Sequence, residues 1–189
     1  LKKTRGDYMK IKNDKLKVYE FLYNRVSFSE EELEEYAHLK RMNVLESVFN
    51  TYLKKIDHSK IEIYWHLTLP IDNKKETIEA MIVTSTTVHL FKILDLAGLH
   101  TINPFNILLK NNLPVLDLNL GEAYYNVIKD TKIEQDGFKK PIFLNYVVLD
   151  ESFSLIGHSN YPFLTPRTLS SYLKRIEDTS QSKKQNALF

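Results

Sequence analysis

The sequence lacks cysteine and has only five glycines among its 189 residues. Without cysteine the chain cannot form disulfides, thiolate zinc sites or iron–sulfur clusters, and it has no cysteine nucleophile. The glycines are too far apart to build a phosphate-binding loop, in which clustered glycines let backbone N–H groups approach a phosphate. We therefore expect no cofactor, and nucleotide-dependent chemistry of the common kinds is disfavoured.

A long apolar segment is also missing. No run approaches the roughly 20 apolar residues that a membrane span requires, and no charged-then-apolar signal peptide opens the chain. The absence of cysteine fits a reducing compartment, so we expect an intracellular protein, cytoplasmic or nuclear. Because the first residue is Leu1 rather than methionine, we expect the chain to be a piece of a longer protein.

The usual motifs for metal binding and catalysis are not found. None of the six histidines stands in an HxxxH, HxH or HExxH pattern, so no metal ligand is predicted. GHSN at 157–160 lacks the second glycine of a nucleophile elbow. SEEELEE at 29–35 places its carboxylates on one helix, without the two environments that an acid–base pair needs. No catalytic residue is predicted, although a metal or acid–base site assembled from distant residues stays open.

The sequence does contain a nearly balanced charge that is unevenly distributed. Lys and Arg number 26 against 24 Asp and Glu, a formal net charge of +2. The first residues are mostly basic, so we expect residues 1–13 to be a flexible basic leader. The polar composition of residues 179–189 predicts a disordered tail. Residues 14–178 between them are interpreted as a single domain, with a sub-boundary near 70–76 or 111–119.

Helical signals dominate the first third of the chain. Residues 14–24 carry apolar side chains at helical spacing. In FSEEEL, Ser29 and Glu32 predict a capping box at the start of a second helix. Apolar residues then recur at helical spacing as far as Ile56. Periodicity alone does not decide whether 30–56 is one helix or two helices broken near HLKRMN.

The segment KIEIYWHLTLP at 60–70 alternates apolar and polar residues and predicts a β-strand. Alternation places five residues on the core face of this strand: Ile61, Ile63, Trp65, Leu67 and Leu69. It places Tyr64 and His66 together on the opposite face. We interpret that face as a solvated or docking surface.

The later elements are expected to be strands and short helices. Residues 77–94 are rich in β-branched residues and predict one or two strands with a bend at TST. Asn103 followed by Pro104 predicts a short helix to about residue 110, and a weaker start follows at 119–122. IFLNYVVL at 142–149 predicts a central strand, joined to SFSLIG in an antiparallel hairpin. Pro166 begins the last helix.

This order favours an α+β fold. We expect a helical N-terminal unit, then a mainly antiparallel sheet with short helices, and a C-terminal helix. In element order alone, residues 14–69 resemble a winged helix-turn-helix. In that case an exposed helical face carries the residues that would contact phosphates and base edges of DNA or RNA: Lys40, Arg41, Asn43, Ser47 and Asn50.

The preferred function is a non-enzymatic interaction or scaffold domain that docks onto other proteins of a multiprotein assembly. Tyrosine is enriched at protein contacts, so the predicted partner-binding residues are Tyr64, His66, Tyr124 and Tyr125. Nucleic-acid binding through residues 14–69 and the basic leader is the first alternative. An enzyme with a distributed metal or acid–base site is the second.

Overall fold

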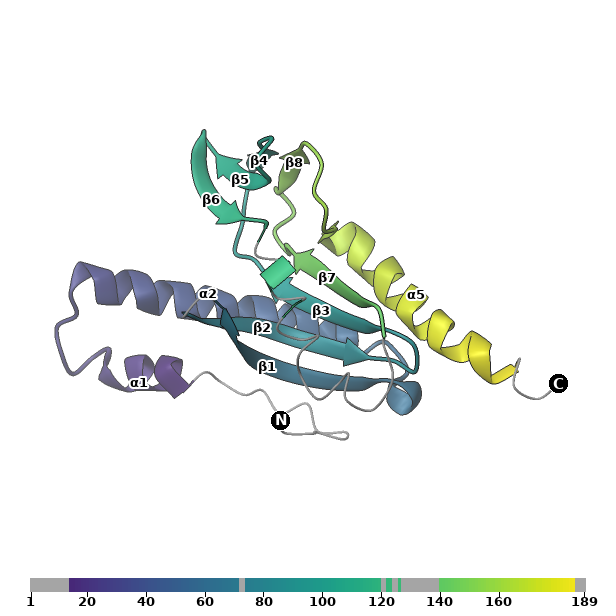
Figure 1. Cartoon of the computed structure of the whole chain (residues 1–189). Helices are drawn as coiled ribbons and strands as arrows, with labels where there is room; N and C mark the ends of the chain where they lie inside the picture. Colours follow the sequence, from purple (N-terminus) through teal and green to yellow (C-terminus); the bar gives the residue numbers. More distant parts are fainter. Residues whose placement is uncertain (1–13, 72–73, 120–121, 124–125, 127–139, 186–189) are drawn as a thin grey trace.

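The computed structural model describes residues 14–71, 74–119, 122–123, 126 and 140–185 (Figure 1). Its helices are α1 (Asp14–Leu22), α2 (Glu30–Leu53), the 3-10 turn η1 (His58–Lys60) and α5 (Pro166–Gln185). The strands are β1 (Glu62–Ile71), β2 (Lys74–Val83), β3 (Val88–Ile93), β4 (Leu99–Ile102), β5 (Ile107–Lys110), β6 (Leu113–Asp117), β7 (Ile142–Val147), β8 (Ser154–Ile156) and β9 (Phe163–Leu164). The predicted α+β class is confirmed.

Within these residues the strands form two sheets. The larger sheet has the order β1-β2-β3-β7-β9, and the smaller sheet has the order β6-β5-β4-β8. Strands β1, β2 and β3 pair antiparallel, whereas β7 lies parallel to both β3 and β9. In the smaller sheet β4 pairs antiparallel with β5 and parallel with β8. Both sheets are therefore mixed, rather than parts of one mainly antiparallel sheet.

The predicted hairpin between 142–149 and SFSLIG is wrong. β7 is a central strand of the larger sheet, as expected, but β8 belongs to the smaller sheet. The Asp150 carboxylate accepts hydrogen bonds from the backbone and hydroxyl of Ser152, at 2.8 and 2.5 Å. This turn directs the chain from one sheet to the other. A turn signal predicts a reversal of direction, but it does not predict which strand the chain pairs with afterwards.

Two further expectations about helices need correction. α2 is one continuous helix of 24 residues, so the three-helix arrangement of a winged helix-turn-helix is wrong. No glycine or proline interrupts HLKRMN, and its Leu, Lys, Arg and Met favour helix. The helix expected at 103–110 is a turn followed by β5, because the Asn103 Oδ1 atom accepts hydrogen bonds from the N–H groups of Phe105 and Ile107.

Other boundaries agree with the sequence more closely. The TST bend separates β2 from β3, and there the Thr84 hydroxyl accepts the N–H of Thr87 at 2.8 Å. The predicted capping box is present: the Glu32 N–H donates to Ser29 Oγ, and the Ser29 N–H donates to Glu32 Oε2 at 2.8 Å. α5 begins at Pro166 and continues to Gln185, so it includes the first residues of the predicted tail. The predicted leader 1–13 lies outside the described residues.

The larger sheet buries both of its faces. On β3, Phe91 and Ile93 belong to a first core, with Phe49 of α2 and Leu173 of α5. The alternate residues Val88 and Leu90 point the other way, into a second core that includes Leu108 and Leu118 of the smaller-sheet region. Figure 1 shows α2 behind the larger sheet, α5 to its right and the smaller sheet above it, beyond the end of β7. The larger sheet thus packs against helices through the first core and against residues of the smaller-sheet region through the second.

β1 changes face at His66, which the simple alternation did not predict. Ile61, Ile63 and Trp65 pack in or against the first core, whereas Leu67 and Leu69 pack in or against the second. His66 has φ = 51°, a left-handed conformation within a strand. Pairing with β2 continues on both sides of it, with Trp65 opposite Ala80 and Leu67 opposite Ile78. The expectation of one core face for all five apolar residues is therefore wrong.

The left-handed conformation of His66 predicts that glycine destabilises the protein less than a β-branched residue at this position, the reverse of the usual order in a strand. Glycine adopts a positive φ without cost, whereas a β-branched residue there costs about 1–2 kcal/mol. We expect His66→Gly to be at least about 1 kcal/mol more stable than His66→Val in urea unfolding, against the usual strand preference.

The exposed Thr68 on the same strand has no positive φ and provides the control. There, the valine variant should be more stable than the glycine variant. Equal stability of the two His66 variants, or a more stable valine variant, would contradict a left-handed His66.

Candidate functional site

The residues predicted to bind nucleic acid do not form one free basic face. The Arg41 Nε atom lies 2.7 Å from Asp95 Oδ2, in an ion pair between α2 and the segment after β3. The Lys40 Nζ atom lies 5.2 Å from the centre of the Tyr36 ring. Asn50 is half-buried, and among the described residues its Oδ1 atom is buried without a hydrogen-bond partner. Asn43 is also half-buried, while Ser47 is exposed.

The predicted partner-binding residues are also separated. The Tyr64 hydroxyl donates to Glu62 Oε2 at 2.7 Å, and its ring packs against the second core. The His66 side chain instead lies near α2, with its Nε2 atom 3.6 Å from Glu46 Oε2. Tyr64 and His66 therefore do not share a face, because the positive φ of His66 breaks the alternation. Tyr124 and Tyr125 lie outside the described residues.

A first candidate site is a group of ionisable side chains where α2 crosses the larger sheet. It consists of Glu46 of α2, His66 of β1, Glu76 and Glu79 of β2, and Lys92 of β3; we call it the carboxylate cluster. Lys92 Nζ lies 3.6 Å from Glu76 Oε2 and 3.9 Å from Glu79 Oε1. Lys92 also donates to the carbonyl of Thr77 at 2.6 Å, which fixes its ammonium beside β2.

The Glu79 carboxylate replaces a backbone carbonyl of the neighbouring strand as a hydrogen-bond acceptor. The β2–β3 pairing extends from Val83 opposite Val88 to Ala80 opposite Phe91. Beyond it, the Ile93 N–H donates to Glu79 Oε2 at 2.7 Å instead of to a strand carbonyl. Glu79 is 5% exposed. The buried carboxyl thus satisfies a backbone donor that would otherwise be left unpaired.

Burial sets the protonation of the cluster. Desolvation raises the pKa of Glu79 to about 7, against the opposing attraction of Lys92. Desolvation, with repulsion from Glu79, raises the pKa of Glu46 to about 7 as well. Desolvation lowers the pKa of His66. Near neutral pH the two carboxyls are therefore close to half-ionised, and the His66 ring is mostly neutral.

A carboxyl that titrates near neutral pH is suited to general acid–base catalysis. The oxygens of Glu79, however, are occupied by the Ile93 N–H and the Lys92 ammonium, and the side chain is almost fully buried. Among the described residues, no group of three or more His, Cys, Asp or Glu is placed to hold a metal ion. The geometry therefore favours a structural role for Glu79 over contact with a substrate.

A second candidate site is the helical hairpin made of α1, the connecting loop and the first turns of α2, residues 14–41. In Figure 1 the N-terminal part of α2 extends beyond the end of the larger sheet, and α1 folds back beside it. The buried residues of α2 are Phe49 and Leu53, both near its C-terminal end. The N-terminal part of α2 therefore packs on α1 rather than on the sheet.

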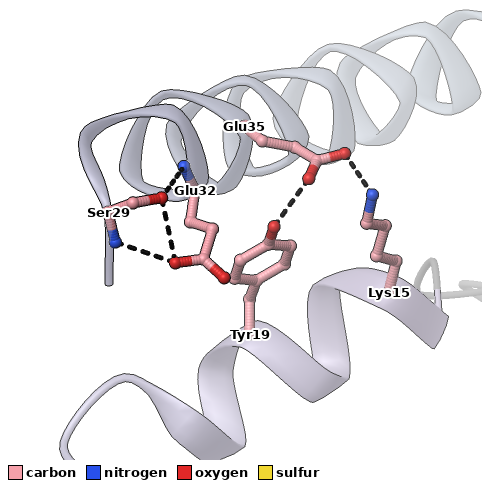
Figure 2. Close-up of polar contacts among 5 residues, drawn as sticks. All are labelled: Lys15, Tyr19, Ser29, Glu32 and Glu35. Atoms are coloured by element: carbon pink, nitrogen blue, oxygen red, sulfur yellow. Dashed lines mark hydrogen bonds and ion pairs between the residues drawn. The ribbon is translucent and has the colours of Figure 1, made fainter. Parts of the chain in front are cut away.

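Aromatic stacking and charge hold the hairpin together (Figure 2). The Tyr19 ring lies 5.4 Å from the Phe28 ring and 5.7 Å from the Tyr36 ring, centre to centre. The Tyr19 hydroxyl donates to Glu35 Oε2 at 2.6 Å, and Lys15 forms an ion pair with the same carboxylate. The hydrogen bond to Glu35 raises the pKa of Tyr19 to about 12. The inner side of the hairpin is thus well packed.

The hairpin also exposes large apolar side chains. Val18 is 56% exposed and Phe21 is 63% exposed, and they stand three residues apart on α1. The Arg25 guanidinium lies 3.6 Å from the centre of the Phe21 ring. Three more exposed apolar residues lie on the loop and the first turns of α2: Tyr23, Val26 and Leu33. We call these five exposed residues of the hairpin the hairpin patch; exposed apolar surface of this kind is typical of a contact surface.

A shallow pocket of about 310 Å³ lies elsewhere, lined by residues of β8, the loop that follows it and β9. Its lining includes His158 and Ser159 from the GHSN segment, with Phe153, Tyr161 and Phe163. Both His158 and Ser159 belong to the loop between β8 and β9, and the hydroxyl of Ser159 accepts the N–H of Tyr161 at 3.1 Å. A nucleophile elbow requires a strand-to-helix turn, and this loop does not provide one.

Most residues of both candidate sites were not predicted from the sequence. Glu79 stands between Ile78 and the apolar run AMIV at 80–83, and a carboxylate between buried apolar residues was a signal that could have identified it. Val18 and Phe21 lie off the stripe of Leu16 and Tyr19, the buried residues of α1. Apolar residues on both sides of a short helix were the corresponding signal for the hairpin patch.

The raised pKa of Glu79 predicts an unusual dependence of stability on pH. The folded protein holds the proton more tightly than the unfolded chain, so this contribution is complete below the ordinary value of 4.5 and is lost as pH rises through about 7. Between about pH 6.5 and about pH 8.5, the free energy of unfolding should fall by about 1 kcal/mol more in the wild type than in Glu79→Gln. Urea unfolding at the two pH values measures this difference.

The choice of pH range and a control variant isolate this effect. His66 and His89, whose pKa values are lowered by burial, lose stability only as pH falls below the ordinary value of 6.5. Glu151→Gln makes the same chemical change at an exposed turn and should keep the wild-type pH dependence. An identical slope in Glu79→Gln and the wild type would show that Glu79 is not responsible.

The comparisons with known proteins identify no relative of this chain. Comparison of the chain with protein-family models, with curated proteins and with solved structures finds no match. In the part of the chain that the structure describes, no helix combines the length and the apolar character needed to cross a membrane.

Proposed function

We propose that the chain is a non-enzymatic interaction domain that docks onto another protein through the hairpin patch. The observation that carries this proposal is the exposure of five large apolar side chains, Phe21 and Val18 above all, on a helical hairpin that extends beyond the sheet. A side chain as large as Phe21 gains about 1.5–3 kcal/mol when a partner removes it from water.

The contacts inside the hairpin indicate that it is ordered before a partner binds. Its inner side is closed by the ring contacts of Tyr19 and by the hydrogen bond from Tyr19 to Glu35. The capping box at Ser29 fixes the start of α2. A partner therefore meets a surface that is already ordered, so binding costs less conformational entropy than folding a flexible segment.

The spacing of the exposed residues indicates the kind of partner. Val18 and Phe21 stand at i and i+3 on α1, which is the spacing of anchors that enter an apolar groove. The Arg25 guanidinium over the Phe21 ring adds a cation at the rim. We infer a folded partner that presents an apolar groove with acidic or polar residues at its edge.

A purification from the native cells tests this proposal. The tagged protein would be recovered after cross-linking, and the bound protein and nucleic acid would be identified and quantified. Replacement of Phe21 by Glu places a charge in the contact, and we expect recovery of the principal bound protein to fall by tenfold or more, about 1.4 kcal/mol or above.

Val44→Glu is the matched control, because Val44 is 58% exposed on α2 outside the hairpin patch. It should leave recovery of the partner unchanged, and both variants should keep the wild-type thermal midpoint. Equal recovery with Phe21→Glu, or recovery of nucleic acid in place of a protein, would reject docking through this surface.

A further inference from the structure

The pocket of about 310 Å³ borders an open edge of each sheet. β8 is the outermost strand of the smaller sheet, and β9 is the outermost strand of the larger one. Residues of both strands line the pocket, together with the loop that joins them. In Figure 1 this loop runs from β8 to the start of α5, on the side of β8 that faces away from β4. A strand edge without a neighbour leaves backbone N–H and C=O groups available for pairing with another chain.

On β8, the residue whose backbone faces the open edge is Leu155. The Ser154 N–H donates to the Gly98 carbonyl at 3.0 Å, so Ser154 directs its backbone groups toward β4. Successive residues of a strand direct their backbone groups to opposite sides, so those of Leu155 point away from β4. Among the described residues, neither the N–H nor the C=O of Leu155 has a hydrogen-bond partner outside the strand pairing.

On β9, Phe163 is placed in the same way. The Pro162 carbonyl accepts the N–H of Tyr146 at 3.0 Å. The Leu164 carbonyl accepts the N–H of Val148 at 2.9 Å. Phe163, which lies between them, therefore presents its own N–H and C=O to the open edge. Within the part of the chain that the structure describes, these two groups have no partner either.

Aromatic rings form an apolar wall of the pocket. The rings of Phe153 and Phe163 are stacked, 5.7 Å apart centre to centre. The Phe153 ring also lies 5.4 Å from the His100 ring, and the Phe163 ring lies 5.1 Å from the Tyr146 ring. His100 and Tyr146 are both 1% exposed, so each lining ring is packed against a buried one. The wall is therefore formed before any ligand binds.

The charge and the size of the pocket restrict what enters it. As far as the structure describes the chain, no Lys, Arg, Asp or Glu lines the pocket. An ionised group entering it would lose hydration without gaining an opposite charge, so the occupant is uncharged. A volume of about 310 Å³ is at the lower end of the range for ligand pockets, which suits one large side chain.

We propose that the pocket is a docking site for a short, extended and uncharged segment of a partner protein, which places one aromatic side chain against the Phe153 and Phe163 rings. The backbone of the segment forms hydrogen bonds with the free N–H and C=O groups of Leu155 and Phe163. In recognition by strand addition, such backbone bonds supply affinity and a side-chain pocket supplies specificity. The site is separate from the hairpin patch and does not rest on docking through it.

Hydrogen exchange with two peptides tests this site on the purified protein. The probes are acetyl-Ser-Thr-Phe-Thr-Ser-amide and the same peptide with alanine in place of phenylalanine. Near saturation with the phenylalanine peptide, the amides of Leu155 and Phe163, followed individually by NMR, should exchange about tenfold more slowly than in the free protein. The alanine peptide should bind about tenfold more weakly, because it lacks the ring that contacts the aromatic wall.

Variants connect binding to the pocket. Ser154→Tyr places a ring at an exposed position of the lining and should weaken binding of the phenylalanine peptide by about tenfold, because it occupies the same space. Ser47→Tyr makes the same change at an exposed position of α2 and should bind the peptide as the wild type does. If Ser154→Tyr does not fold, Phe153→Leu removes one ring of the wall and should also weaken binding. Phe21→Glu in the hairpin patch should leave binding of the peptide unchanged.

Three results would overturn this docking site: unchanged exchange at both amides, equal binding of the two peptides, or wild-type affinity in the pocket variants. Binding of toluene as tight as that of the phenylalanine peptide would also reject it, in favour of a cavity for small molecules. Protection of the two amides that grows with protein concentration alone would assign the pocket to a second copy of the chain. Because these measurements do not involve the hairpin patch, their failure and the failure of docking through that patch are independent.

Discussion

The fold depends on a sheet that must bury both of its faces. β3 and β7 are apolar on both sides, so neither a helical layer nor a second sheet alone could cover them. α2 and α5 supply one core and the smaller sheet supplies part of the other. The left-handed His66 lets β1 contribute to both cores, since the strand changes face there without losing its pairing with β2. The free energy cost of the left-handed backbone at His66 is thus offset by the burial of Leu67 and Leu69.

The chain path follows from the same constraint. After β3 the chain leaves for the smaller sheet, returns as β7, leaves again for β8 and returns as β9 before α5. Each crossing places a strand parallel to one that it could not reach by a tight turn, which is why β3, β7 and β9 lie parallel. The two sheets are therefore built together and support each other through the second core.

Polar groups inside this structure are placed where the regular pattern ends. Glu79 accepts the first N–H of β3 that β2 no longer pairs, and His89 lies between the Thr87 and Tyr172 hydroxyls, at 2.9 and 3.0 Å. Burial lowers the pKa of His89 to about 4, so this ring is a neutral structural residue at physiological pH. The carboxylate cluster differs, because its two acids titrate near neutral pH at the contact between a helix and the sheet.

Signals that act over a few residues were readable from the sequence alone. The capping box at Ser29, the TST bend and the burial of β7 were predicted, because side-chain capping, turn chemistry and apolar runs act within one element. The absence of cysteine and of clustered glycines likewise decided which chemistries to set aside.

Only the tertiary structure decided which elements pair and which side chains meet. The predicted hairpin after Asp150 failed because β7 pairs with β3 and β9 instead of with β8, and nothing local encodes that choice. At His66 the apolar residues of β1 change from the first core to the second, because both cores must be filled. The proximity of Glu46 to Glu79 follows from where α2 crosses the larger sheet. Free energies of burial depend on contacts between residues far apart in sequence, and periodicity within one segment carries no information about them.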